Sequence, residues 1–390
     1  MSRILKILAI AIFGGFLAVE GYLNVPCVQN SLPKRGFEWS KFVTKARENY
    51  RSSFYGKNRW IDGNGLYARL TGRRLQNGAL AYRRGILGYP RHVKTKTICQ
   101  VKGLSEWKEF VERQGARLLY VQVPTKIDRA CELLPLGADP AQHTLFADGD
   151  RMVAELREKG ICCLDFCDEL AGTADKVCRN FYRTDHHWRH EAVFSVFPRV
   201  AGEIAALAGK RLETGAFDPA NWQEHSFPRD YLGSGGRRTG SGFCGYDDFM
   251  YRTPKFETDI DFRIPAKKFH RWGSFEQSIV DPRVTMEHVD PYRACRYHVY
   301  CGSSHKFMCI RSRLAPCKLR LLIVKDSFAV PMIGLLSTVF SEIDVIDPRD
   351  FKGRISEHVL KFKPDVVMFF VNTIALDSPT FYSFVPPQAR

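Results

Sequence analysis

The carboxyl-terminal part of the chain alternates uninterrupted apolar segments with amphipathic ones. Residues 319–324, 343–346 and 366–371 are apolar throughout, and residues 329–340 and 355–362 between them have helical periodicity. A strand that is apolar at every position is typically buried on both faces, as in a parallel sheet covered by helices. Three such strands joined by two crossover helices form half of a doubly wound sheet. The sequence therefore predicts an α/β fold with ligand sites at the carboxyl ends of its strands.

The same alternation begins earlier in the chain, near residue 98. The predicted elements are helices at 104–114, 148–159 and 190–207, and strands at 117–123 and 161–166. Between residues 210 and 316 the alternation is lost. Residues 233–245 are rich in Gly, Ser and Arg, and residues 256–262 alternate apolar with polar positions. We therefore predict a catalytic domain at 98–390, with an insertion at about 210–316 of loops and antiparallel strands that walls a substrate cleft.

The amino-terminal 25 residues have the composition of a targeting segment. Residues 7–19 are apolar and follow a positively charged start, as in a signal peptide or signal anchor. The run is shorter than the ~20 residues of a typical spanning helix. Val19 stands where a cleavage site prefers a small residue, which favours an uncleaved anchor and a periplasmic or cell-surface body. Lys34 and Arg35 weaken this orientation signal. A secreted protein and a buried helix of a cytoplasmic protein are the alternatives.

Residues 26–97 form a basic region. Between residues 34 and 96 there are sixteen Lys and Arg against three acidic residues, within a chain of net charge +16. Asn64-Gly65 and Asn77-Gly78 are turn signals, so we predict hairpins and loops packed on the main domain. Such a region attracts an anionic membrane, an acidic polysaccharide or nucleic acid, or it is simply a solvated surface. No nucleic-acid-binding motif accompanies it, and no nucleic-acid partner is predicted.

The twelve cysteines permit disulfides in an oxidising compartment but do not demonstrate them. Three of them lie in or beside the apolar strand at 161–166, where a thiol behaves as a small hydrophobe. Cys295, Cys301, Cys309 and Cys317 are spaced too widely for a zinc knuckle. The sequence predicts no structural metal and no cofactor.

Ser327 is the candidate nucleophile. It lies in Lys325-Asp326-Ser327-Phe328, between a buried strand and a helix. A hydroxyl at a strand tip is exposed, and the first N–H groups of the next helix point towards a developing oxyanion. The alternative role is an N-terminal cap of that helix.

Asp185 and His187 are the candidate orienter and base. They lie in Tyr182-Arg183-Thr184-Asp185-His186-His187-Trp188, just before the helix predicted at 190–207. Residues two apart in an extended segment point to the same side, so Asp185 can bond one nitrogen of His187 and leave the other for Ser327. His186 is then expected to face the other side. The alternatives are helix capping by Asp185 or Thr184, and a metal site of His186, His187 and His190 without a completing carboxylate or cysteine.

Four further residues are candidates for binding an oxyanion or substrate. Lys126 and Asn372 each follow a predicted strand, and Arg237 and Arg238 lie in the Gly-rich loop. An arginine there suits a sugar carboxylate or the oxyanion, and Asn372 suits the oxyanion. The alternatives are a surface lysine, an exposed structural loop and an ordinary turn asparagine.

These segments together resemble the DHHW family, which is related to alginate O-acetyltransferase proteins with an SGNH-hydrolase-like domain. The resemblance also includes segments 123–126, 233–240 and 340–347, in the expected order, and covers about residues 64–372. It implies a three-layer sandwich and a triad of Asp185, His187 and Ser327. The serine comes last, so the motif order is circularly permuted relative to ordinary SGNH hydrolases. Lys325 replaces the glycine of Gly-Asp-Ser-Leu, which leaves the oxyanion donors unidentified.

We therefore expect an extracytoplasmic O-acetyltransferase of a cell-surface or exported polysaccharide, acting through a serine acyl-enzyme. The resemblance implies a membrane-bound O-acyltransferase partner that supplies the acyl group. The basic region suits an acidic polysaccharide or lipid headgroups, and the amino-terminal segment attaches the chain to the membrane. The alternatives are a carbohydrate acetylesterase with the same triad and a non-enzymatic polysaccharide-binding or assembly protein.

Overall fold

The computed structural model describes residues 11, 14–15, 18–26, 29–32, 38–89, 97–136, 144–287 and 289–388. The chain divides into two compact units, Met1–Asn64 and Gly65–Arg390. The signal segment predicted at 7–19 lies mostly outside the described residues. None of the helices in the described ranges is both long enough and apolar enough to cross a membrane.

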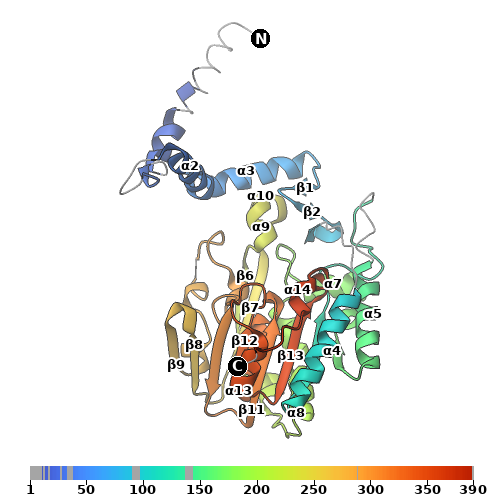
Figure 1. Cartoon of the computed structure of the whole chain (residues 1–390). Coiled ribbons are helices and arrows are strands. Elements are labelled where there is room, and N and C mark those ends of the chain that lie inside the picture. The colour runs from blue at the N-terminus through green and yellow to red at the C-terminus, as the bar shows by residue number, and fades with distance from the viewer. Residues whose placement is uncertain are drawn as a thin grey trace. The chain divides into compact units, whose positions relative to one another are not determined.

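The second unit contains an eight-stranded sheet with strand order β5-β4-β13-β11-β12-β10-β8-β9 (Figure 1). In this order the strands are Cys162–Asp165, Arg117–Val123, Val366–Asn372, Cys317–Lys325, Phe340–Ile346, Phe307–Ser312, Ile260–Ile264 and Phe269–Gly273. The first five strands are parallel to their neighbours, and β10, β8 and β9 continue the sheet antiparallel. The predicted mostly parallel α/β sheet is therefore confirmed.

Helices cover both faces of the parallel strands. The helices are α4 Thr97–Arg113, α5 Thr144–Glu158, α8 His190–Leu207, α12 Val330–Leu336 and α13 Ile355–Phe362. One core joins α8 and α12 to strand residues such as Leu119 and Ile323. A second core joins α4, α5 and α13 to the alternate strand residues, such as Leu118 and Leu322. Both faces of the central strands β4, β13 and β11 are thus buried over most of their length, which explains the uninterrupted apolar segments and confirms the three-layer sandwich.

The predicted insertion divides into two parts. Strands β6 Trp222–Tyr231 and β7 Asp247–Pro254 form a separate antiparallel ribbon, with the short helices α9 Ser234–Thr239 and α10 Ser241–Cys244 between them. Strands β8, β9 and β10 instead extend the main sheet beyond β12. The insertion therefore enlarges the sheet as well as placing loops beside the strand tips.

The hairpin prediction was wrong for part of the basic region. Residues Trp39–Ser53 and Lys57–Leu70 form helices α2 and α3, and the Asn64-Gly65 turn signal lies inside α3. A Cβ at Gly65 would lie 2.2 Å from the carbonyl oxygen of Thr239, so close packing explains this glycine better than a turn does. Asn77-Gly78 does connect two antiparallel strands, β1 Leu75–Gln76 and β2 Ala79–Ala81, and both turn residues have positive φ.

The helix predicted at 329–340 is shorter in the structure. A 3₁₀ turn, η8 Ser327–Ala329, leads into α12, which ends at Leu336, and Phe340 already begins β12. The Ser337 and Thr338 hydroxyls donate to the carbonyls of Gly334 and Leu335, at 2.6 and 2.8 Å. These hydroxyls satisfy carbonyl groups at the carboxyl end of α12, which no further helical turn is present to bond.

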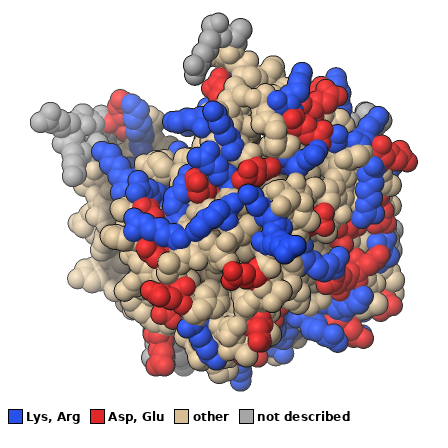
Figure 2. Space-filling view, turned by 90° about the horizontal axis from the view of Figure 1, so that it is seen from below, with Lys and Arg blue, Asp and Glu red and all other residues tan. Residues whose placement is uncertain are grey.

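Charges of both signs are mixed on the surface. Figure 2 shows Lys and Arg side chains across one face with Asp and Glu among them. At the amino ends of β11 and β12, Arg311 and Arg320 pair with Glu342 at 3.4 and 3.3 Å. These arginines are therefore not a source of unpaired positive charge.

Candidate active site

Ser327 lies immediately after β11, in the first position of η8. The turn is capped by Asp326: its Oδ1 accepts the Phe328 N–H at 2.8 Å, and its Oδ2 accepts the Asn372 N–H at 2.8 Å. The same carboxylate thus caps the turn and ties the tip of β11 to the tip of β13. Ser327 is not the cap, and its hydroxyl is available for another partner.

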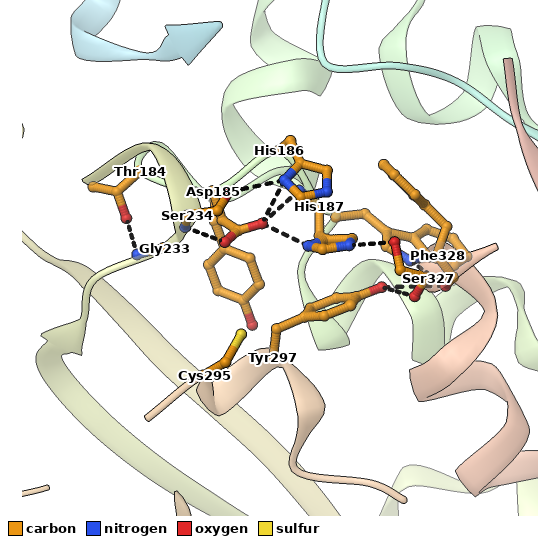
Figure 3. Close-up of polar contacts among 12 residues, drawn as sticks. Thr184, Asp185, His186, His187, Gly233, Ser234, Cys295, Tyr297, Ser327 and Phe328 are labelled. Carbon is orange, nitrogen blue, oxygen red and sulfur yellow. Dashed lines mark hydrogen bonds and ion pairs between the residues drawn. The ribbon is translucent and has the colours of Figure 1, made fainter. Parts of the chain in front are cut away.

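That partner is His187 (Figure 3). The Nε2 of His187 lies 2.8 Å from Oγ of Ser327, and its Nδ1 lies 2.6 Å from Oδ1 of Asp185. The structure therefore brings together the three side chains that the sequence proposed as a triad, across 140 residues of chain. Their order of contact, carboxylate to imidazole to hydroxyl, is the arrangement that activates serine for acyl transfer.

The segment that carries Asp185 is a bend and not a strand. Oδ1 of Asp185 accepts the backbone N–H of His187 at 3.0 Å as well as its ring nitrogen, forming an Asx-type turn. The pairing of Asp185 with His187 therefore comes from local hydrogen bonding, and the two-residue alternation of an extended segment does not apply. His186 consequently does not face the other side, contrary to the prediction.

The backbone of this bend is held from two sides. Asp247 accepts the N–H groups of Arg183 and Thr184, each at 2.8 Å, and also the Thr184 hydroxyl. On the other side, the ammonium group of Lys126 donates to the carbonyl oxygens of Tyr182, Arg183 and Asp185. The conformation of the bend is therefore held by hydrogen bonds within the protein.

Asp185 is buried and fully hydrogen-bonded. Its Oδ2 accepts the Tyr231 hydroxyl at 2.9 Å and the Ser234 N–H at 2.6 Å. Burial alone would raise the pKa of Asp185, but His187 and the hydrogen bonds hold it well below its ordinary value. The carboxylate is thus ionised and can orient the imidazole and stabilise its protonated form.

His187 is neutral in this environment. Burial, and next the charge of His186, lower the pKa of His187 to about 3 despite the opposing effect of Asp185. With Nδ1 facing the carboxylate, Nε2 is the nitrogen in a position to accept a proton from the Ser327 hydroxyl. The site therefore has its base in the form that proton transfer requires.

Two aromatic rings enclose His187. The His186 ring lies 3.7 Å from it between centroids, and the Tyr297 ring lies 3.8 Å from it and nearly parallel, at 11°. His186 Nδ1 also lies 2.9 Å from the Ser234 hydroxyl. Sequence reasoning missed Tyr231, Ser234 and Tyr297, because no local pattern connects them to the bend; only the Gly-rich loop around Ser234 gave a signal.

Two of the four supporting candidates, Lys126 and Asn372, bond backbone carbonyl groups in this structure. Lys126 is buried, and three carbonyl acceptors match the three protons of its ammonium group, so no donor is left for an oxyanion. Asn372 donates to the Pro124 carbonyl at 2.7 Å, which ties β13 to the residue after β4. Both positions are therefore structural parts of the site, and the surface position considered for Lys126 is wrong.

Arg237 and Arg238 occupy α9, next to Ser234. Arg237 is partly buried, whereas Arg238 is exposed, with its guanidinium 5.4 Å from the centre of the Tyr89 ring. Arg238 also lines a pocket of about 170 Å³ beside His186. The lining residues are Tyr82, Gly88, Tyr89, Thr125, Lys126, Leu145, His186, Ser234, Arg238 and Ile374. This lining contains two cationic side chains and no carboxylate, so it favours an anionic or hydroxyl-bearing ligand.

One group among the described residues has the spacing of metal ligands: Asp185, His186 and His187, with ligating atoms within 4.8 Å of one another. Both oxygens of Asp185 and both nitrogens of His187 already have protein partners. His190, predicted as a possible third histidine ligand, bonds the Tyr182 hydroxyl at 3.0 Å instead. These contacts fit a triad better than a metal site.

A family comparison agrees with the resemblance predicted from the sequence. Residues 92–240 match the family model described as the SGNH hydrolase-like domain of acetyltransferase AlgX. The matched segment includes Asp185 and His187 and ends before Ser327. No match was found among curated proteins.

Solved structures share the fold. Bacillus cereus PatB1 is 16% identical and superposes with a TM-score of 0.61, covering 76% of this chain and 97% of PatB1. PatB1 with a sulfonyl adduct is 15% identical with a TM-score of 0.62, covering 79% and 100%. A DHHW family protein from Eubacterium siraeum is 17% identical with a TM-score of 0.59, covering 80% and 98%. The predicted resemblance is thus confirmed: over residues 92–240 this chain is similar to the SGNH hydrolase-like acetyltransferase domain of AlgX.

Proposed function

We propose that the protein is an O-acetyltransferase of a cell-surface or exported polysaccharide and that Ser327 carries the acetyl group as an ester. The observation that carries this proposal is the continuous contact from Asp185 through His187 to Ser327, at 2.6 and 2.8 Å. The similarity of residues 92–240 to an acetyltransferase domain supports acyl transfer as the reaction class.

The reaction has two steps. Oγ of Ser327 attacks the acetyl carbonyl of the donor while Nε2 of His187 takes the serine proton; the tetrahedral intermediate collapses and the leaving group receives that proton. A sugar hydroxyl then attacks the acetyl ester, and His187 takes the hydroxyl proton. Collapse of the second intermediate forms the sugar ester and returns the proton to Ser327. Asp185 stabilises the imidazolium in both steps.

The backbone N–H of Ser327 is a candidate oxyanion donor. It is the first N–H group of η8, and the described part of the chain offers it no acceptor, whereas the Phe328 N–H is already bonded to Asp326. An N–H group at such a position is available to a developing oxyanion. Lys126 does not serve this purpose, because its three ammonium protons match three carbonyl acceptors.

The pocket beside His186 is the proposed acceptor site. Tyr89 offers a ring face for a sugar, and Arg238 offers a guanidinium for a sugar carboxylate. A larger cavity of about 530 Å³ lies at the amino ends of β11 and β12, the opposite ends from Ser327. We assign the acceptor to the smaller pocket, because only that one adjoins the triad.

The proposed location is extracytoplasmic, with the segment at 1–25 as an anchor and a membrane-bound O-acyltransferase as the acyl supplier. The likeness to AlgX supports the location. The anchor, the acyl supplier and attraction of the basic region to an anionic partner rest on the sequence alone.

Transfer is tested with purified protein, a 4-nitrophenyl acetate donor and an acidic or neutral oligosaccharide. We expect the wild-type protein to produce acetylated sugar. This product should be absent with Ser327→Ala and present with the control Ser195→Ala, on α8. If free acetate is the only product, with or without sugar, the transferase proposal is replaced by the acetylesterase alternative. No turnover and no labelling of Ser327 by a sulfonyl fluoride, a reagent class suggested by the PatB1 adduct, would favour a binding protein.

The acceptor site is tested separately. Arg238→Ala is expected to raise KM for an acidic acceptor and to leave the KM for the uncharged acetyl donor unchanged. The matched control is Arg263→Ala, an exposed arginine on β8 that pairs with Asp261. An equal KM for the acidic acceptor in both variants would remove Arg238 from acceptor binding.

A further inference from the structure

Tyr297 contacts both the base and the nucleophile of the proposed site. It belongs to η7 Arg296–His298, far along the chain from His187, and its side chain is fully buried. Its ring stacks on His187 with centroids 3.8 Å apart, and its hydroxyl lies 3.2 Å from the carbonyl oxygens of both Ser327 and Phe328 (Figure 3). One rigid side chain therefore spans from the imidazole to the turn that presents the nucleophile.

The ring restricts the plane of the imidazole. His186 lies against the other face of His187, so the imidazole is enclosed between two rings and keeps the orientation that points Nε2 at Ser327. The ring also acts on charge, because an aromatic face attracts a cation. His187 is neutral at rest and becomes cationic when it takes the serine proton. The Tyr297 ring therefore stabilises the transition state more than the resting state.

The hydroxyl restricts the turn. Trp188, the residue after His187, donates its indole N–H to the Phe328 carbonyl at 2.9 Å. Among the described residues, the side-chain donor to the Ser327 carbonyl is Tyr297, in addition to the backbone N–H of Val330 within the turn. Tyr297 of η7 thus fixes the backbone carbonyl of Ser327 and also stacks on His187.

We propose that Tyr297 is a positioning residue that sets the separation between His187 and Ser327 and stabilises the imidazolium formed during acyl transfer. This inference rests on the proposed acyl-transfer chemistry. It assigns a catalytic contribution to a residue of the insertion at about 210–316, in addition to the cleft-walling role that the sequence predicts for this segment.

The test compares Tyr297→Phe and Tyr297→Leu in the full chain, with Tyr300→Phe as the control. Tyr300 is also buried, and its hydroxyl bonds the backbone of Arg252 without contacting the triad. Tyr297→Phe keeps the ring and is expected to lower kcat about tenfold through loss of one hydrogen bond, at unchanged KM. Tyr297→Leu is expected to lower kcat about tenfold further through loss of the stacked ring. Tyr300→Phe is expected to leave kcat unchanged.

A purely structural role gives a different pattern. In that case all three variants lose stability in urea while kcat per folded molecule stays at the wild-type value, and the proposal is overturned. If Tyr297→Leu does not fold, Tyr297→Phe against Tyr300→Phe decides the question.

The rate of sulfonyl fluoride labelling separates this inference from the proposed function. In labelling, Oγ of Ser327 forms the bond to sulfur, fluoride leaves, and His187 takes the proton. Labelling of wild-type Ser327 that is slower in both Tyr297 variants supports the positioning role even if no acetyl transfer is found. Equal labelling rates in wild type and both variants overturn this inference alone, and absence of both labelling and turnover in wild type overturns both proposals.

Discussion

Tyr231 donates its phenolic hydrogen to Oδ2 of Asp185 across 2.9 Å, on the side of the carboxylate away from His187. Both residues are buried, so this bond is protected from competing water. It leaves Oδ1 facing the two histidines: the backbone N–H and Nδ1 of His187 contact it at 3.0 and 2.6 Å, and Nδ1 of His186 lies 3.3 Å away. The second layer of the site thus fixes which carboxylate oxygen faces the base.

Replacing Tyr231 with Phe removes this donor and leaves a buried, charged oxygen with one partner fewer. We expect the free energy of unfolding to fall by about 2 kcal/mol and turnover to fall severalfold. Urea unfolding and steady-state kinetics measure the two effects. Tyr120→Phe is the control, because the Tyr120 hydroxyl is buried and bonds Gln122 in β4, apart from the triad. Equal turnover in the two variants would contradict an orienting role for Tyr231.

Acid should inactivate the enzyme at an unusually low pH. His187 accepts a proton only when neutral, so kcat/KM falls as pH drops through its pKa. Burial and His186 lower that pKa to about 3, with His298 acting in the same direction and Asp185 against it. We expect kcat/KM to be flat from pH 7 down to below pH 5, measured on protein shown by circular dichroism to remain folded.

His186→Asn removes one of the charges that lower the pKa of His187. We therefore expect the acid limb of kcat/KM to move to higher pH, whereas His270→Asn, on exposed strand β9, leaves it in place. A wild-type limb near pH 6.5, or no movement in His186→Asn, would contradict the electrostatic description.

Lys126→Met should be among the most damaging single substitutions. It leaves three buried carbonyl groups of the Tyr182–Asp185 bend without their donor, at a cost of about 3 kcal/mol or more in unfolding free energy. Lys102→Met, on the exposed side of α4, is the control and should be near neutral. A Lys126→Met protein with wild-type stability would show that the bend does not depend on this ammonium group.

Gly233→Ala tests the close approach behind Asp185. A Cβ at Gly233 would lie 2.3 Å from the Cβ of Asp185 and 2.6 Å from its backbone nitrogen. One of the two segments must move, and we expect a loss of about 2 kcal/mol together with most of the activity. Gly202→Ala in α8 meets no atom within 4 Å and should stabilise the helix by about 1 kcal/mol. Thermal unfolding of both variants checks the contrast.

The sequence predicted correctly those helices and strands whose ends are defined by neighbouring residues in the chain. Strand β4 and helices α8 and α13 have the predicted bounds, because buried periodicity and flanking breakers define their ends. Helix α3 was missed because Asn64-Gly65 is a turn signal only when no neighbour requires a small residue. The neighbour that requires one at Gly65 is Thr239, which lies 174 residues further along the chain.

The same limit applies to the site. Ser327, His187 and Asp185 lie in short segments that are unusual by themselves, so their contact with one another could be predicted. Tyr231 and Tyr297 look like any buried tyrosine in the sequence, and only the fold brings them to the triad. The predicted orientation of His186 was wrong because the His187 backbone N–H donates to Oδ1 of Asp185, and this hydrogen bond turns the chain at that point.

Because Asp326 caps η8, the structural role in this turn belongs to one residue and the proposed reactive role to the next, Ser327. Because the carboxylate of Asp326, and not the serine hydroxyl, completes the turn and joins β11 to β13, the fold does not depend on the side chain at 327. A descendant of this chain with Ala or Gly there is expected to remain folded and to lose only the proposed acyl transfer. Among related sequences, an aspartate at this position therefore reports on architecture, and the serine beside it reports on activity.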